Sequence, residues 1–164
     1  MIKKDDKNIK TIKVLLIEDN KEDIRTITRF LEQSKRLKAD IETVDSIQKA
    51  NKVMLHDKMD IIIFDLNIQG IKFEELIDNI DKNNLSIPHI VITDERDEDL
   101  GIEAVKKGAQ DYLVRSELSE RILRRALIYS LERHEILELS LIHISEPTRP
   151  ERIGGGLVGG EKKI

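Results

Sequence analysis

Short apolar runs rich in β-branched residues alternate along this chain with segments in which apolar residues recur every three or four positions. The runs are typical of buried strands, and the longer spacing is typical of helices that cover a sheet. Five such alternations predict an α/β fold, a doubly wound five-stranded parallel sheet with helices on both faces. The predicted strands are Lys13–Glu18, Asp40–Val44, Asp60–Asp65, Ile87–Thr93 and Gln110–Val114.

The last predicted helix is longer than a single core requires. It runs from about Glu117 to Ser140, and its apolar stripe continues beyond the point where a domain of this kind should be complete. Such an extension suits pairing with a second copy or a connection to an effector region. We therefore expect a flexible N-terminus over residues 1–11 and one domain with an extended last helix over residues 12–140.

Residues 141–164 differ in composition from the rest of the chain. Pro147 and Pro150 break the helical pattern, and the glycine-rich stretch 154–160 cannot support a packed core. We expect this tail to be disordered. Because residues 140–150 also look like a translated sequencing-adaptor fragment, a native and a non-native origin of the tail both stay open.

Charge and composition exclude several function classes. The formal net charge is −4, acids and bases are interleaved, and no basic stripe with aromatic residues is present, so we expect no direct binding of nucleic acid. The apolar runs suit buried strands and are too short for a bilayer, which predicts a cytoplasmic protein without a membrane segment. The chain has no cysteine, so disulfides and thiolate metal sites are excluded.

Carboxylates collect where a sheet of this kind binds ligands, beyond the carboxyl ends of its strands. Glu18 and Asp19 follow the first strand, and Asp65 closes the third. Three carboxylates this close repel one another unless a hard cation such as Mg²⁺ lies among them. For Glu18 and Asp19 alone, capping of the next helix is the simpler explanation. Asp65 has no comparable structural role, which favours a functional site.

Two further strand ends add a hydroxyl and a cation to the same edge. Thr93 closes the fourth strand and Arg115 follows the fifth. A transferred phosphoryl group gains negative charge on its oxygens, and a hydroxyl donor and a cation stabilise that charge. Each residue alone is explained by ordinary strand or loop preferences, but together they predict phosphoryl transfer to Asp65.

Four motifs, in this order, resemble the receiver domains of bacterial and archaeal response regulators. They are residues 14–20 (VLLIEDN), 61–67 (IIIFDLN), 90–93 (IVIT) and 108–114 (GAQDYLV). The resemblance covers residue 12 to about residue 135. It implies the flavodoxin-like receiver fold and a signalling module of a two-component system, which is not a turnover enzyme.

The resemblance also implies roles for individual residues. Mg²⁺ would be held by Glu18, Asp19, Asp65 and the backbone carbonyl of Asn67. Asp65 would accept the phosphoryl group from a sensor histidine kinase or a phosphotransfer protein, in a phosphorelay.

The remaining implied roles concern the switch. Thr93 would move toward the phosphoryl group, Tyr112 would turn inward, and Arg115 would supply the positive charge. The changed surface would include the fourth helix, the fifth strand and the fifth helix, through which a homodimer is expected to form.

Three alternatives remain open at this stage. A degenerate receiver would act as a phosphorylation-independent interaction module, and Arg115-Ser116, in place of the family's usual Lys-Pro, favours it. An aspartate-nucleophile phosphatase would need a second acid at position 67, which is asparagine. A flavodoxin-type binder would need a phosphate loop where Glu18 and Asp19 stand.

Overall fold

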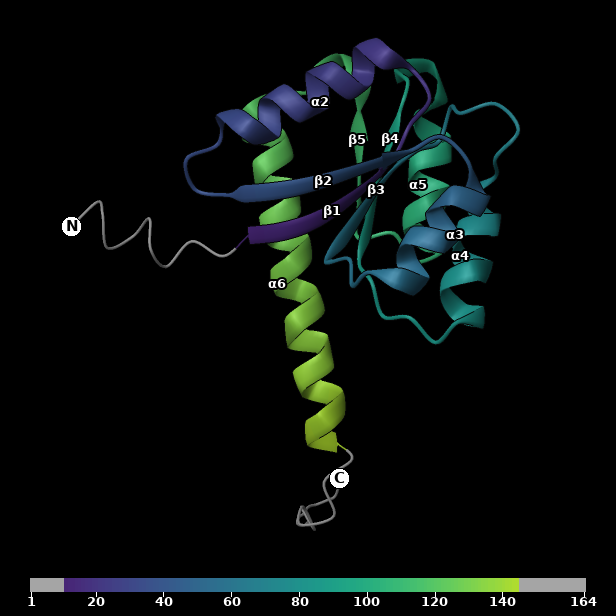
Figure 1. The fold of residues 1–164 in the computed structure, drawn as a ribbon, viewed down its shortest axis with the longest axis vertical. Coiled ribbons are helices and arrows are strands. Elements are labelled where there is room, and N and C mark those ends of the chain that lie inside the picture. The colour runs from purple at the N-terminus through teal and green to yellow at the C-terminus, as the bar shows by residue number, and fades with distance from the viewer. Residues whose placement is uncertain (1–10, 145–164) are drawn as a thin grey trace, which may run out of the picture. The chain divides into compact units, whose positions relative to one another are not determined.

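The computed structural model of the protein describes residues 11–144, with side chains up to residue 135. Within this range five strands form one parallel sheet in the order β2-β1-β3-β4-β5, and the predicted fold class is confirmed (Figure 1). The elements are β1 (Thr11–Ile17), α2 (Lys21–Gln33), β2 (Lys38–Val44), α3 (Ile47–His56), β3 (Ile61–Asp65), α4 (Phe73–Lys82), β4 (His89–Thr93), η1 (Glu95–Asp97), α5 (Glu98–Lys106), β5 (Asp111–Val114), η2 (Arg115–Glu117) and α6 (Glu120–Ile144).

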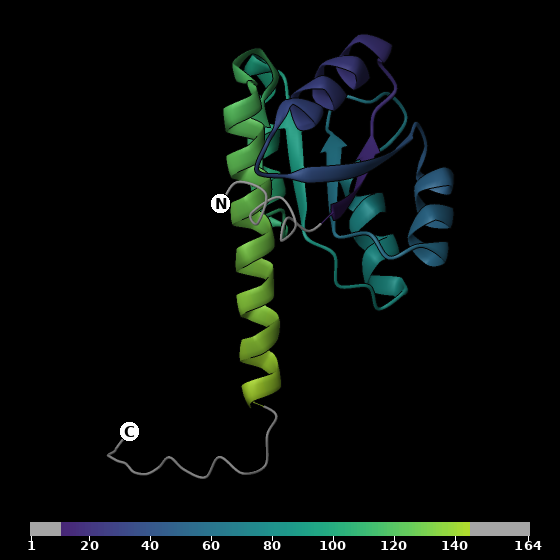
Figure 2. The same ribbon diagram turned by 60° about the vertical axis from the view of Figure 1, so that its left-hand side comes forward.

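Strands β3 and β4 and the second half of β1 are buried on both faces, which explains the apolar runs at their centres. Alternate residues of each strand point to opposite faces, so Leu15 packs in one apolar cluster and Leu16 in the other. Figure 2 shows the sheet between the first part of α6 (Glu120–Leu131), in green, and α3 and α4, in blue and teal.

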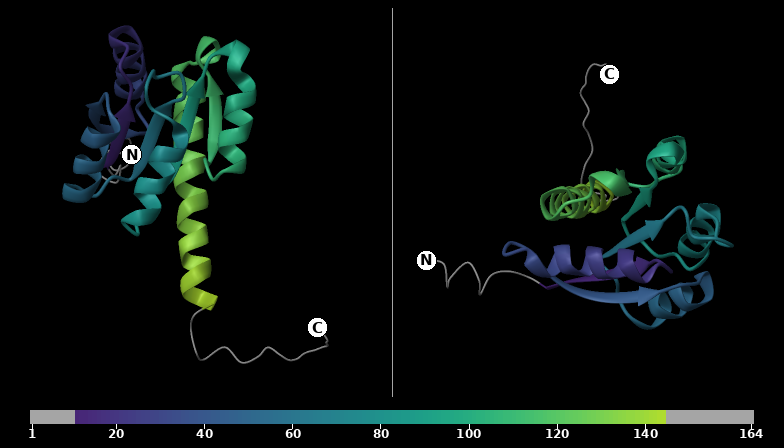
Figure 3. Two further views of the ribbon diagram at one scale, coloured as in Figure 1. Left: turned by 90° about the vertical axis from the view of Figure 1, so that its right-hand side faces the viewer. Right: turned by 90° about the horizontal axis from the view of Figure 1, so that it is seen from above.

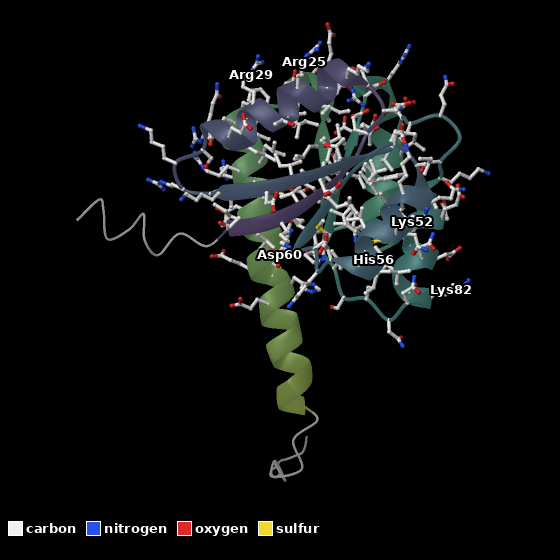
Figure 4. All side chains as sticks on the ribbon, viewed as in Figure 1. Arg25, Arg29, Lys52, His56, Asp60 and Lys82 are labelled. Atoms are coloured by element: carbon white, nitrogen blue, oxygen red, sulfur yellow. The ribbon has the colours of Figure 1, made fainter. Side chains whose placement is uncertain are left out.

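The helices of the two layers present matching apolar stripes. One cluster takes Met54 of α3, Leu76 of α4 and Ala104 of α5, and the other takes Ile27 of α2 and Leu123 of α6. Figure 3 shows β5 between α5 and α6. The opposite helix faces carry charged side chains, as Arg25 and Arg29 of α2 show in Figure 4. The periodicity of three and four residues is therefore explained by burial against the sheet.

Helix α6 crosses the boundary between two compact units of the chain. Residues up to Leu131 belong to the sheet domain, and the described part of the second unit is the helical stretch from Glu132 to Ile144. The helix therefore ends four residues beyond the predicted end at Ser140, because apolar residues continue to Ile144 and the next proline after the start of α6 stands at position 147. Flexibility was predicted for residues 1–11 and disorder for residues 141–164. Of these, Thr11 belongs to β1 and residues 141–144 belong to α6, and the others lie outside the described residues.

A helix that spans a bilayer needs about 20 mostly apolar residues. None of the helices between residues 11 and 144 combines the length and the apolar content that a membrane span needs.

Candidate functional site

Strand register brings Glu18 and Asp65 side by side. Ile17 of β1 pairs with Phe64 of β3, so the next residue of each strand meets the other at the carboxyl edge of the sheet. Both side chains are almost fully enclosed: Glu18 is 0% and Asp65 is 4% exposed. Two carboxylates at this depth are costly to ionise unless positive charge compensates them.

Asp19 completes a group of three carboxylates. One oxygen from each of Glu18, Asp19 and Asp65 lies within 4.8 Å of the others. Helix α2 begins with Asn20 as its cap, whose side-chain oxygen accepts the Asp23 N–H at 3.0 Å. The sequence allowed Asp19 or Asn20 as the cap of this helix, and the structure has Asn20 in that role.

The environment of Glu18 fits a hard cation. Its Oε2 accepts the backbone N–H groups of Asp19 at 3.1 Å and Asn20 at 3.2 Å, while its buried Oε1 has no hydrogen-bond partner among the described residues. Burial, and then the neighbouring Asp65 carboxylate, raise the pKa of Glu18 to about 8. An oxygen-preferring divalent ion would satisfy this atom and remove the cost of its charge.

Arg115 lies against the acidic group and donates to three carboxylates. Its Nη2 is 2.6 Å from Oδ1 of Asp65, its Nη1 is 2.7 Å from Oδ2 of Asp23, and its Nε is 2.7 Å from Oδ1 of Asp94. A fourth oxygen, Oε1 of Glu18, lies 3.6 Å from Nη1. Burial lowers the pKa of Arg115, but the hydrogen bond to Asp94 and the charge of Asp65 outweigh it and raise that pKa above its ordinary value. The guanidinium is a permanent cation here.

The role of Asp23 was not predicted from the sequence. It lies in the first turn of α2, and burial raises its pKa although the charge of Arg115 acts in the opposite direction. Its place in the first turn after the Asn20 cap is the sequence signal that would have placed it near the same edge. The contact between Arg115 and Asp94 was not predicted from the sequence either.

Asn67 ties Asp65 to the loop that follows β4. Its backbone N–H donates to Oδ1 of Asp65 at 3.0 Å. Its side chain accepts the N–H of Asp94 at 2.9 Å and donates to Oδ2 of Asp97 at 2.9 Å. The loops after β3 and β4 are therefore joined at the site. The expected role of the Asn67 carbonyl as a metal ligand stays a prediction.

Thr93 and Tyr112 donate their hydroxyl hydrogen bonds outside the group of Glu18, Asp19 and Asp65. The buried Thr93 hydroxyl donates to the backbone carbonyl of Asp97 at 2.9 Å. The partly exposed Tyr112 donates its hydroxyl to Oε2 of Glu98 in α5 at 2.7 Å. The structure thus brings Glu18, Asp19, Asp65 and Arg115 together at one edge and places Tyr112 against α5.

Comparisons with known proteins agree with this arrangement. The chain matches the family described as "Response regulator receiver domain" over residues 14–127. It is 29% identical to response regulator protein FleR of Pseudomonas aeruginosa over 128 residues, which is 77% of this chain and 25% of FleR. It is 27% identical to the C4-dicarboxylate transport transcriptional regulatory protein DctD of the same organism, over 73% of this chain and 26% of DctD. The chain spans about a quarter of the length of these curated relatives.

A solved structure shows the same fold. The signal receiver domain of a Luxo repressor protein from Vibrio parahaemolyticus superposes with a TM-score of 0.68 at 24% identity, over 80% of this chain and 98% of that one. Receiver domains of this kind are signalling modules and interact with histidine kinases. With the family match spanning most of its length, this chain belongs to the response regulator receiver domain family of two-component systems.

Proposed function

We propose that this receiver is switched by transfer of a phosphoryl group to Asp65, with Mg²⁺ as the required cation. The observation that carries the proposal is the position of the Asp65 carboxylate. It belongs to the group of three carboxylates, and its Oδ1 lies 2.6 Å from the Arg115 guanidinium. A carboxylate between a cation site and a fixed cation is suited to accept a phosphoryl group, whose charge needs neutralisation in place.

Glu18, Asp19 and Asp65 would hold the Mg²⁺, which neutralises phosphoryl oxygens when bound. The proposed donor is a phosphohistidine on a sensor histidine kinase or phosphotransfer protein in the cytoplasm. A carboxylate oxygen of Asp65 attacks phosphorus, the bond from histidine nitrogen to phosphorus breaks, and the imidazole nitrogen retains that electron pair.

The response would begin at Thr93. Its hydroxyl donates to the Asp97 carbonyl, and a phosphoryl oxygen on Asp65 is a stronger, charged acceptor. Transfer of this hydrogen bond would release the loop 94–97 at the start of α5. The proposed output surface is α5, β5 and α6, where Tyr112 would turn inward and a homodimer would form.

The degenerate receiver is the second candidate, and one observation favours it. Each of the three guanidinium nitrogens of Arg115 already donates to a carboxylate. If these partners hold Arg115 too firmly to serve a phosphoryl group, the same fold would act as a phosphorylation-independent interaction module.

Intact-mass spectrometry after incubation with acetyl phosphate and Mg²⁺ tests the proposal. Wild type should gain one phosphoryl group, and EDTA should prevent the gain. Asp65→Asn should remain unmodified. Asp60→Asn is the matched control, because Asp60 precedes the same strand at its other end and accepts the Lys13 N–H at 2.8 Å. Labelling of Asp65→Asn would show that another residue accepts the phosphoryl group. No labelling of wild type, even by its own kinase, would leave the interaction module as the function.

A further inference from the structure

Arg115 is held in place by carboxylates from outside the group of three that would bind the metal. Asp94 comes from the loop after β4 and contacts Nε, whereas Asp23 comes from α2 and contacts Nη1. A guanidinium is a planar fork, so a partner at Nε fixes the direction of the two terminal nitrogens. With Asp94 on one edge, Nη2 faces Asp65.

Asp94 is itself fixed, which makes it an effective anchor. Its backbone N–H donates to the side chain of Asn67, and its carboxylate is only one-third exposed. A free arginine side chain has about 2 kcal/mol of rotamer entropy and would leave the site for part of the time. The contact with Asp94 reduces the entropy that Arg115 would lose when an anion binds, because the cation is already in place.

We infer that Asp94 is a positioning residue, whose carboxylate holds the Arg115 guanidinium against Asp65 and so prepares the site for an anion there. This inference rests on the proposed function. By charge alone, Asp94 would repel an incoming phosphoryl group. Through its hydrogen bond to Nε it would instead favour that group. The two effects have opposite signs, so substitutions at this position separate them.

Three substitutions distinguish the hydrogen bond from the charge. Asp94→Ala removes both, and Asp94→Asn keeps an acceptor oxygen for Nε while removing the charge. Glu95→Ala is the matched control, because Glu95 is the next acid in the same loop, is exposed, and contacts Ser116 at 3.5 Å, not Arg115. Loss of the hydrogen bond should therefore appear only in Asp94→Ala.

The anchoring is measured first, on the full chain without added metal or phosphate mimic. The ¹⁵N–¹H signal of Arg115 Nε, identified by its absence in Arg115→Lys, should exchange slowly with water in wild type, Asp94→Asn and Glu95→Ala. In Asp94→Ala it should broaden or disappear. An equally protected signal in Asp94→Ala would overturn the inference, since Asp94 would then not hold the guanidinium.

The consequence for the anion is measured as the affinity for beryllofluoride with Mg²⁺. Asp94→Ala should bind roughly tenfold more weakly, the loss expected for one charge-assisted hydrogen bond of about 1.4 kcal/mol. Asp94→Asn should recover most of that affinity, and Glu95→Ala should match wild type. Equal or tighter binding by Asp94→Ala would overturn the inference, and so would an equal loss in both Asp94 variants. If wild type fails to bind, the proposed function fails and the positioning role fails with it, while the Nε signal still reports the anchoring.

Discussion

Tyr112 stands three residues before Arg115 but belongs to a different environment. Its hydroxyl donates to Glu98, and its ring covers Gly101 of α5. A Cβ added at Gly101 would lie 2.7 Å from Cδ2 of this ring, closer than two carbon atoms approach without a shift. Glycine at position 101 therefore allows the aromatic side chain to lie against the helix backbone.

Replacement of Gly101 by alanine should displace the Tyr112 ring and break its bond to Glu98. In wild type that hydrogen bond raises the pKa of the Tyr112 phenol above its ordinary value. The pKa should therefore fall toward the ordinary value in Gly101→Ala, as measured by ultraviolet absorbance during an alkaline titration. Tyr112→Phe is the control, because it leaves only the transition of Tyr129, the other tyrosine of the chain. An unchanged Tyr112 transition would show that the ring accommodates the methyl group where it is.

At the scale of a single element, the serine that precedes α6 and a serine within it are in opposite situations. Ser119 precedes the helix, and its Oγ accepts the Ile122 N–H at 3.1 Å. Ser130 is fully buried inside the helix, and its hydroxyl has no hydrogen-bond partner in the described part of the chain. The first hydroxyl satisfies a helix-end donor, whereas the second is desolvated without compensation.

Alanine at these two positions should change stability in opposite directions. Ser119→Ala should lower the free energy of unfolding by about 1 kcal/mol, because a cap is lost. Ser130→Ala should raise it by roughly 0.5–1 kcal/mol, because an unpaired polar group is replaced by the residue with the highest helix propensity. Urea unfolding monitored by circular dichroism measures both. A lower stability for Ser130→Ala would mean that its hydroxyl is bonded in solution.

At the scale of the whole molecule, the buried carboxylates of Glu18 and Asp65 lower the free energy of unfolding. Burial and the neighbouring Asp65 carboxylate raise the pKa of Glu18 to about 8, so folded Glu18 keeps a proton that the unfolded chain releases near pH 4.5. Over this interval the folded state binds more protons than the unfolded state, and the free energy of unfolding must fall as pH rises. Glu18 therefore destabilises the folded state most at high pH, where its side chain is ionised. At that pH a divalent cation would compensate the charge.

Replacement of Glu18 by glutamine should remove this pH dependence. In EDTA, wild type should lose on the order of 1–3 kcal/mol relative to Glu18→Gln between pH 5 and pH 8.5, since each unit of pKa shift corresponds to about 1.4 kcal/mol and coupling to Asp65 reduces the total. Mg²⁺ should restore wild type at pH 8.5 and have a smaller effect on the variant.

Thermal unfolding across this pH range, with and without Mg²⁺, provides the measurement. Glu22→Gln is the control, because Glu22 is an exposed acid in the first turn of α2. Asp23, whose pKa burial also raises, contributes in the same direction but is present in all three proteins. Parallel pH curves for wild type and Glu18→Gln would contradict the assignment.

Periodicity along the chain was sufficient to predict the sheet, because strands buried on both faces must be continuously apolar. The predicted strand Asp60–Asp65 corresponds to β3 within one residue. The boundaries of β2 were less accurate: it begins at Lys38, where pairing with Thr11 extends the ladder beyond the apolar residues. Between β4 and β5 the chain first forms the short helix η1, and α5 starts only at Glu98.

The convergence of Glu18, Asp65 and Arg115 could also be predicted from the sequence, since parallel strands end at one edge and the residues after them must meet there. The hydrogen-bond partners of these residues could not be predicted from the sequence. Arginine is long enough to reach several carboxylates, and chain order does not rank Asp23 against Asp94. The hydroxyl of Thr93 donates to Asp97 because the loop after β4 is held by Asn67. These contacts join residues far apart in the chain, so they depend on how the loops pack around the sheet and not on local residue preference.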